Sequence, residues 1–131
     1  RAEAQEYHGP RVAIGTKIIP VEVMRTGEEI QRGLSGRATL QKDTGMLFLF
    51  EKPDIYRFWM KDMEFPIDII WLDSARRVAY IAARVPPLKA GAVPVFYASK
   101  APAQYVLELN AGESARLGLT KGVRVDFSGL E

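Results

Sequence analysis

The sequence predicts an α+β domain that is mainly β, a small curled or barrel-like sheet of about seven or eight short strands with two short helices. Three observations support this prediction. Short strand-like segments separated by turn residues occupy most of the chain. Two segments carry helix-start signals. The stretch 45–73 holds both tryptophans and four of the six phenylalanines, which is typical of the centre of a sheet.

The N-terminal part predicts a lead-in followed by two strands. Residues 1–10 are polar and without periodicity, so we expect a flexible lead-in before a single globular domain over 11–131. Strands are expected over 11–14 and 17–25, joined by a turn. Pro20 cannot donate a backbone hydrogen bond, so the second strand is expected at a sheet edge or with a bulge at this position.

A helix is predicted to begin at Thr26. Thr26 and Glu29 form a capping-box signature, in which each side chain satisfies a backbone donor of the other. Acidic residues in the first turn also suit the positive end of the helix dipole. The helix presents Ile30 and Leu34 on one face and is expected to end near Gly36.

The middle of the chain predicts four further strands. The unbroken apolar run 46–50 indicates a strand that is covered on both faces. Residues 56–61 alternate with the period of a strand, which puts Tyr56, Phe58 and Met60 on one face and Arg57, Trp59 and Lys61 on the other. Segments 67–72 and 77–85 are expected to form a hairpin, with Asp68 on the face opposite to that of its immediate neighbours.

The C-terminal part predicts a loop, a strand, a helix and a last strand. Residues 86–94 form a long irregular loop with three prolines, and loops of this kind carry function more often than short ones. A strand is expected over 104–110. Asn110 is predicted to cap a short second helix that ends at Gly118, and the last strand is expected over 123–127.

Composition argues against several classes of function. The chain is 47% hydrophobic and 26% charged, which is ordinary for a globular domain. Its net charge is +2 and no basic stripe is visible, so we expect no nucleic-acid partner. The absence of cysteine excludes disulfides, thiolate metal ligands and cysteine nucleophiles. No apolar run approaches the length of about 20 residues that spans a bilayer, so no transmembrane segment is expected.

Asp68 is the carboxylate that most calls for an explanation. The one histidine, His8, lies in the lead-in, which argues against histidine-based triads and zinc sites. A carboxyl flanked by Ile67, Ile69 and Ile70 is expected to be desolvated, which favours its neutral form and would suit an acid, a base or a ligand anchor. The alternative is a buried structural carboxylate that pairs with a nearby cation or with backbone donors.

A second candidate feature is the face formed by Arg57, Trp59 and Lys61. An indole between two cations can stack on a flat ligand while the cations hold an anion. In the alternative, Trp59 belongs to the core and its neighbours lay their stems over it. The candidate ligand-binding residues are Arg32, Arg37, Trp59, Lys61, Asp62 and Asp68.

No metal and no cofactor are expected. The four methionines lie on or beside apolar segments, where methionine fills cores far more often than it binds a soft metal. No segment has the density of oxygen ligands that calcium needs, and no glycine-rich phosphate loop follows a strand.

Several short motifs follow one another along the chain in a characteristic order and at characteristic spacings. They are Arg32-Gly33-Leu34, Arg37 with Leu40, Gly45-Met46-Leu47-Phe48, Phe58-Trp59-Met60-Lys61, Pro66-Ile67-Asp68-Ile69 and the closing Val106-Leu107-Glu108-Leu109. Together they resemble the domain of unknown function 192 family over about residues 12–127. The resemblance implies a compact, mainly β, barrel-like fold in a family without an agreed activity. Many members carry an N-terminal signal or lipoprotein segment, so the resemblance implies a periplasmic or otherwise exported protein, and a chain that begins without Met fits a processed form.

Two positions depart from the family pattern. Gly33-Leu34-Ser35 stands where the family usually reads Gly-Leu-Met, and Lys61-Asp62-Met63 stands where it usually reads Lys-Asn-Thr. The first change adds a hydroxyl and the second replaces an amide by a charge. A ligand carried over from a relative would therefore meet altered polarity here.

The leading functional hypothesis is a non-enzymatic binding or accessory domain that holds a small ligand or a partner segment at the face of Trp59, Lys61 and Asp68. The lack of a complete nucleophile–base pair favours it. One alternative is a hydrolase or lyase that uses Asp68 with Asp62 or another carboxylate about 5–10 Å away. A second alternative is an oligomerisation surface that holds no ligand.

Overall fold

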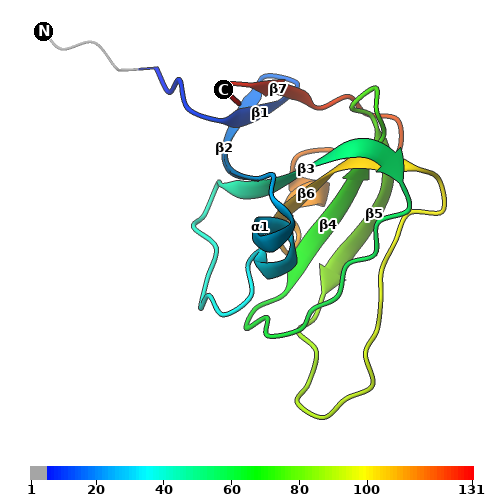
Figure 1. Ribbon diagram of the computed structural model, residues 1–131. Coiled ribbons are helices and arrows are strands. Elements are labelled where there is room, and N and C mark those ends of the chain that lie inside the picture. Colours follow the sequence, from blue (N-terminus) through cyan, green and yellow to red (C-terminus); the bar gives the residue numbers. More distant parts are fainter. Residues whose placement is uncertain (1–5) are drawn as a thin grey trace, which may run out of the picture.

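The computed structural model describes residues 6–131, so residues 1–5 of the predicted lead-in lie outside the described residues. The described chain has seven strands and two short helices, as predicted (Figure 1). In chain order they are β1 (Arg11–Ile14), β2 (Lys17–Met24), α1 (Gly27–Arg32), β3 (Gly45–Asp54), β4 (Ile67–Leu72), β5 (Val78–Val85), β6 (Ala103–Asn110), α2 (Glu113–Arg116) and β7 (Asp126–Ser128).

The strands form one curled sheet that does not close into a barrel, in the order β5-β4-β6-β3-β2-β1-β7. Neighbouring strands are antiparallel except for β2 and β3. These two run parallel because α1 and the irregular segment after it carry the chain back to the start of the sheet. The mainly β, α+β prediction is confirmed.

Both faces of the central strands are buried, which produces two apolar clusters. One cluster fills the inside of the curl with every second residue of β3, β4 and β6, including Leu47, Ile70 and Leu107. The other cluster contains Phe48 and Trp71 and is covered by α1 and by the segment between β3 and β4. All six residues of β4 are buried, so the interpretation of the middle of the chain as the sheet centre is confirmed.

A short stretch near the C-terminus brings the two ends of the sheet together. Val78 donates a backbone hydrogen bond to Val123 at 2.9 Å, and Gly122 donates back to Val78 at 2.8 Å. Val125 donates to the carbonyl of Arg76 at 2.8 Å. The chain therefore bridges from the start of β5 to β7 without a continuous ladder, which explains a sheet that curls strongly and stays unclosed.

The prediction of a strand over 56–61 is wrong. Only Phe58 pairs in strand fashion, through an isolated bridge to Tyr97. The alternation itself is present, since Met60 is buried and Trp59 is 39% exposed. One row of its side chains packs against the sheet, but its backbone has no partner strand to hydrogen-bond with continuously. The segment therefore shows the side-chain alternation of a strand without being part of a sheet.

Helix α1 begins as predicted, with Thr26 as its N-cap and a complete capping box. The backbone N–H of Glu29 donates to Thr26 Oγ1 at 3.1 Å, and Glu29 Oε1 accepts from the Thr26 N–H at 3.0 Å. The helix ends earlier than expected, because Gly33 takes φ 47° directly after the last helical residue. A β-carbon at Gly33 would also lie 3.2 Å from the ring of Phe48.

Replacing Thr26 with alanine should lower the free energy of unfolding by about 1 kcal/mol, since one helix-end donor loses its acceptor. Urea denaturation followed by circular dichroism measures this loss. Thr16→Ala is the control, because Thr16 is an exposed turn residue remote from any helix end. Equal effects of the two substitutions would contradict a stabilising role for the cap.

The predicted cap of the second helix is wrong. The N-cap of α2 is Gly112, with φ 90° and no capping side chain of its own. The Asn110 amide instead donates to the backbone carbonyl of Leu40 at 3.0 Å. The donors at the start of α2 are satisfied by Asp68 of β4, as described below. The sequence signal identified the helix but missed a cap supplied from a distant strand.

Candidate functional site

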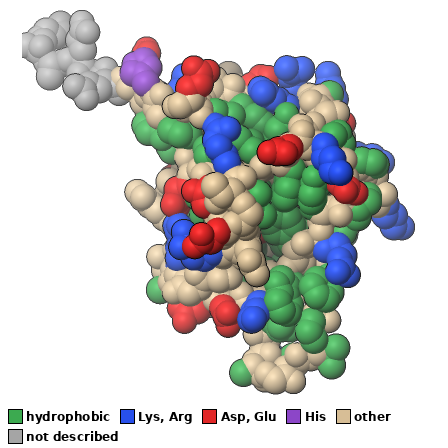
Figure 2. Space-filling model, viewed as in Figure 1, with side chains coloured by type: hydrophobic (Ala, Val, Ile, Leu, Met, Phe, Trp, Pro, Cys, Tyr) green, Lys and Arg blue, Asp and Glu red, His purple; other side chains and the backbone are tan. Residues whose placement is uncertain are grey.

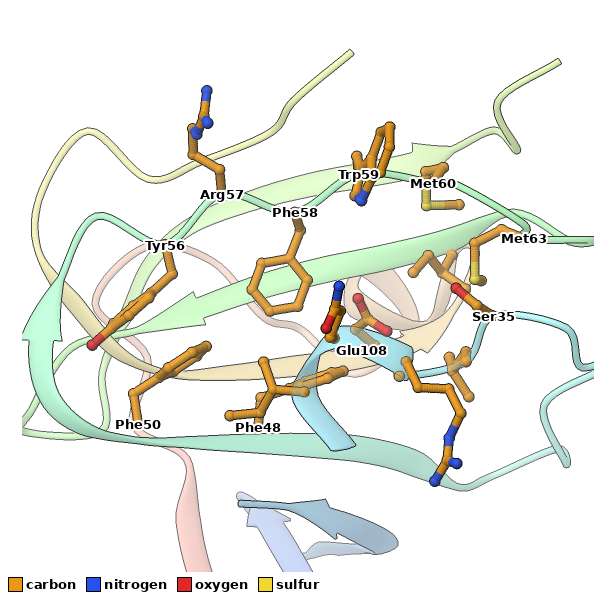
Figure 3. Close-up of a pocket in the computed structure, with 16 residues that line it drawn as sticks. Ser35, Phe48, Phe50, Tyr56, Arg57, Phe58, Trp59, Met60, Met63 and Glu108 are labelled. Carbon is orange, nitrogen blue, oxygen red and sulfur yellow. The ribbon is translucent and has the colours of Figure 1, made fainter. Parts of the chain in front are cut away.

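A cavity of about 220 Å³ lies between α1, β3, the segment 56–60 and β6 (Figure 3). Its lining is mostly apolar and aromatic, with polar side chains at the mouth and one carboxyl inside. The lining residues are Ile30, Gln31, Arg32, Gly33, Leu34, Ser35, Phe48, Phe50, Tyr56, Arg57, Phe58, Trp59, Met60, Met63, Ile67 and Glu108. Concave, apolar sites with a few convergent polar groups are the usual form of small-molecule pockets.

Glu108 supplies that carboxyl. It lies in the middle of β6, paired with Met46 of β3 on one side and Ile69 of β4 on the other. Its residue is 5% exposed, and Figure 3 shows its side chain directed into the space between Phe58 and Met63. Burial raises the pKa of Glu108 to about 8 from an ordinary value of 4.5. Desolvation is the cause, so Glu108 is neutral at pH 7.

The aromatic walls of the cavity are fixed by mutual packing. The ring of Phe58 meets Phe48 edge-on at 5.1 Å between centroids and Trp71 at 6.0 Å. Phe50 and Tyr56 stack at 3.6 Å. The Trp71 indole N–H donates to the carbonyl of Tyr56 at 2.9 Å, which holds the start of the covering segment against the sheet. The walls are therefore largely preformed.

The mouth of the cavity is polar and cationic. Arg32 lines it and is exposed. Arg57 also contributes to the lining, but its side chain is directed away from the cavity in Figure 3, and its guanidinium lies 4.5 Å from the centroid of the Phe96 ring. Trp59 contributes to the lining as well, and its exposed ring is also directed away from the cavity in Figure 3. The Ser35 hydroxyl donates to the carbonyl of Lys61 at 2.9 Å, which ties the turn after α1 to the covering segment. The cavity thus has a neutral acid at its inner end and positive charge at its opening.

Asp68, the leading carboxylate of the sequence analysis, lies on the other face of β4 and does not line the cavity. It is fully buried. Its Oδ1 accepts from the backbone N–H of Arg84 at 2.8 Å and of Gly112 at 3.1 Å. Its Oδ2 accepts from the backbone N–H and the hydroxyl of Ser114, at 2.8 Å and 2.6 Å.

Through these four hydrogen bonds, Asp68 stabilises the contact between three segments of the chain. Ala83 and Arg84 bulge out of β5 opposite Asp68, and Arg84 has a φ of 51°. The bulge leaves its N–H without a ladder partner, and Asp68 supplies the acceptor. The same carboxylate receives the first donors of α2. One side chain therefore joins β4, the β5 bulge and the β6–α2 turn.

The expectation that desolvation makes Asp68 neutral is wrong. Desolvation does raise its pKa, but the hydrogen bonds from Ser114, Arg84 and Gly112 outweigh it. The net pKa of Asp68 lies below its ordinary value of 3.8, so the group is ionised at neutral pH.

The remaining predicted site residues are partly brought together. Arg32 and Trp59 line the same cavity, and the Lys61 ammonium lies 5.4 Å from the Trp59 ring centroid. Arg37 lies elsewhere, in an ion pair with Glu22 at 2.6 Å. Asp62 is exposed and lies outside the lining of the cavity.

Trp59 is not a core residue. It is 39% exposed and stacks on Phe96 at 5.4 Å between ring centroids. The interpretation in which Trp59 is buried under the stems of its neighbours is therefore wrong, although the Lys61 side chain does lie against it.

Sequence reasoning missed Glu108. The signal was present, since Val106-Leu107-Glu108-Leu109 places a carboxyl in an apolar strand just as the surroundings of Asp68 do. The alternation over 104–110 predicts Tyr105, Leu107 and Leu109 as the inward row, and it does not indicate whether the other row is covered. Because β6 is covered on both sides, Val106 and Glu108 are buried as well.

No cluster of three His, Asp or Glu side chains suited to a metal ion occurs within residues 6–131. In the same part of the chain, neither helix has the length and apolar character needed to cross a bilayer.

The fold and the cavity define a small mainly β domain with an apolar pocket built around a buried glutamate. The chain belongs to the domain of unknown function 192 family, described as "Uncharacterized ACR", whose model matches residues 11–127. The resemblance seen in the sequence is confirmed.

Two solved structures are similar to this chain. A protein of unknown function from Novosphingobium aromaticivorans DSM 12444 is 37% identical with a TM-score of 0.77, and the match covers 89% of this chain and 83% of that one. A "putative transcription regulator" from Sinorhizobium meliloti 1021 is 30% identical with a TM-score of 0.81, and the match covers 92% and 93%. No curated protein matches the chain.

Proposed function

We propose that this domain is a small-molecule binding module whose ligand enters the cavity around Glu108. The observation that carries the proposal is a neutral, buried carboxyl at the inner end of an aromatic-walled cavity that opens beside Arg32. Buried polar groups are normally paired, because an unpaired one costs the free energy of its lost hydration. A ligand that pairs with Glu108 recovers that cost and gains affinity from it.

The lining indicates what the ligand looks like. A neutral carboxyl donates one hydrogen bond and accepts another, which a carboxamide matches with its own donor and acceptor. The walls formed by Phe48 and Phe58 favour a flat apolar body. Arg32 at the mouth favours an anionic group at the exposed end. A volume of about 220 Å³ limits the enclosed part to roughly the space of seven water molecules.

Catalysis by paired carboxylates has less support at this site. Glu108 is the one acidic residue in the lining formed by the described chain, so the second carboxyl that such hydrolases use is missing from the cavity. Asp68 has both oxygens engaged by protein donors. Binding without chemistry fits the observed groups better.

A series of small aromatic probes tests the proposal. We expect 4-carbamoylbenzoate to bind more tightly than benzamide, and benzamide more tightly than toluene, in isothermal titration calorimetry at pH 6.5. Glu108→Leu should remove the preference for the amide, because leucine fills a similar volume without a hydrogen bond. Arg32→Gln should remove the preference for the carboxylate.

Arg37→Gln is the matched control, since Arg37 pairs with Glu22 away from the cavity. Binding of the amides should also weaken above about pH 8, where Glu108 ionises and can no longer donate. Absence of binding by all three probes, or binding that Glu108→Leu leaves unchanged, contradicts the proposal.

The regulator description belongs to the Sinorhizobium meliloti protein. Helices α1 and α2 of this chain have six and four residues and do not form the paired helices of a helix-turn-helix reader. We therefore place ligand binding, rather than DNA reading, at the centre of the proposal. An exported location is also a proposal, supported by the family resemblance, and cell fractionation tests it.

A further inference from the structure

The loop between β5 and β6 projects from the body of the domain and exposes apolar side chains. In Figure 1 it extends as the yellow-green segment at the bottom of the view, and in Figure 2 hydrophobic side chains gather on the same projection. Val93 is 82% exposed, Val95 49% and Phe96 46%. Contiguous exposed apolar side chains on a soluble domain mark an interaction surface.

The loop is held in this exposed position by the covering segment of the cavity. Phe58 and Tyr97 exchange backbone hydrogen bonds at 2.9 Å and 2.8 Å. Phe96 stacks on Trp59, and both rings are exposed. The apolar tip is therefore presented by a fixed base, and Trp59 extends the apolar surface onto the neighbouring segment.

Positive charge surrounds this surface. The Arg57 guanidinium lies 4.5 Å from the centroid of the Phe96 ring, and the Lys61 ammonium lies 5.4 Å from that of Trp59. The loop itself, residues 86–102, contains no Asp or Glu and two cations, which are Lys89 and Lys100. Acidic residues do occur beside Lys61 in sequence, at Asp62 and Glu64. The charged side chains of the loop are therefore all cationic.

We propose that residues 88–97, together with Trp59, dock onto an anionic lipid surface. Val93-Pro94-Val95 carries no hydrogen-bonding side chain, and Pro94 has no backbone N–H, so the tip offers little to a polar partner that needs specific hydrogen bonds. A lipid interface requires only apolar side chains that enter the acyl boundary, aromatic rings at headgroup level and cations near the lipid phosphates. This surface supplies all three.

Vesicle co-sedimentation tests the proposal on the whole chain. We expect wild-type protein to sediment with vesicles of phosphatidylglycerol and phosphatidylcholine at 50 mM NaCl, and at least fivefold less with phosphatidylcholine alone. Val93→Asp should reduce sedimentation with the anionic vesicles by about tenfold. Because Val93 is 82% exposed, the substitution leaves the core intact.

Ile18→Asp is the matched control. It makes the same kind of change at a 52% exposed residue of β2, at the opposite end of the molecule from the loop (Figure 1). This variant should sediment like wild type. Equal sedimentation of Val93→Asp and wild type, or failure of wild type to sediment with anionic vesicles, overturns the proposal.

Trp59 provides an independent measurement of insertion. Trp71 is fully buried, so a change in tryptophan emission on vesicle binding reports Trp59. We expect a blue shift with anionic vesicles that is absent with soluble inorganic polyphosphate. The same blue shift with polyphosphate, or no shift with vesicles that do carry the protein down, indicates attraction by charge alone and overturns docking through the apolar tip.

Discussion

Replacing Asp68 with asparagine is expected to lower the free energy of unfolding by about 3–5 kcal/mol, measured by urea denaturation at pH 7. The carboxylate accepts four hydrogen bonds from Arg84, Gly112 and Ser114. Asparagine keeps one accepting oxygen and turns an N–H₂ group toward donors, so at least one buried N–H loses its partner. Since small domains are stable by about 5–15 kcal/mol, this single change removes a large share of the total.

Ser114→Ala is the graded comparison for Asp68→Asn. It deletes the hydroxyl that donates at 2.6 Å and keeps the backbone bonds, so it should cost about 1–2 kcal/mol. If both variants lower the free energy of unfolding by a similar amount, the Asp68 carboxylate does not stabilise the contact between β4, the β5 bulge and the β6–α2 turn as described. Asp68→Asn should also leave binding of the aromatic probes unchanged in protein that remains folded, because Asp68 does not line the cavity.

Glu108 is expected to give the domain an unusual dependence of stability on pH. Its pKa is about 8 in the folded protein against about 4.5 in the unfolded chain. Between these values the folded state keeps a proton that the unfolded state has lost, so stability falls as pH rises through this window. The slope approaches about 1.4 kcal/mol per pH unit, and the loss between pH 5 and pH 8 is on the order of 3–4 kcal/mol.

Urea denaturation at pH 5, 6.5 and 8 measures this slope, and Glu108→Gln should flatten it because glutamine does not titrate. The exposed Glu64 provides the control, and Glu64→Gln should keep the wild-type slope. Asp68 acts in the opposite direction, since its lowered pKa gives stability above about pH 3.8 that is lost as pH falls further. Stability should therefore peak near pH 4–5, and a maximum at pH 7–8 would contradict this account of Glu108.

The fold could be predicted from local patterns where those patterns decide the structure. The capping box of Thr26 and Glu29 and the double-covered run at 46–50 depend on neighbours in sequence, and both predictions are confirmed. The cap of α2 could not be found in this way, because its acceptor, Asp68, is 44 residues from Gly112 in the chain. The strand at 56–61 failed for a related reason, since a period of two does not specify a hydrogen-bonded neighbour.

The candidate site was predicted only in part. Arg32 and Trp59 do share a cavity, and cations with an exposed aromatic ring are recognisable in sequence. The sequence alone does not indicate which of two carboxyls, Asp68 or Glu108, lines a cavity, because both have apolar neighbours in a strand. What separates them is the number of backbone donors that face each one, which depends on the bulge at Arg84 and on the start of α2.

The bridge between the start of β5 and residues 122–125 also limits how much backbone the sheet exposes at its edges. An unclosed sheet has two edges, and a free edge can template pairing with another chain. Here β7 is only three residues long, the start of β5 is covered by Val123, and the end of β5 is bent by the bulge at Arg84. Neither edge offers a long flat row of donors and acceptors. The same backbone contacts that curl the sheet thus guard a β-rich chain against edge-to-edge aggregation.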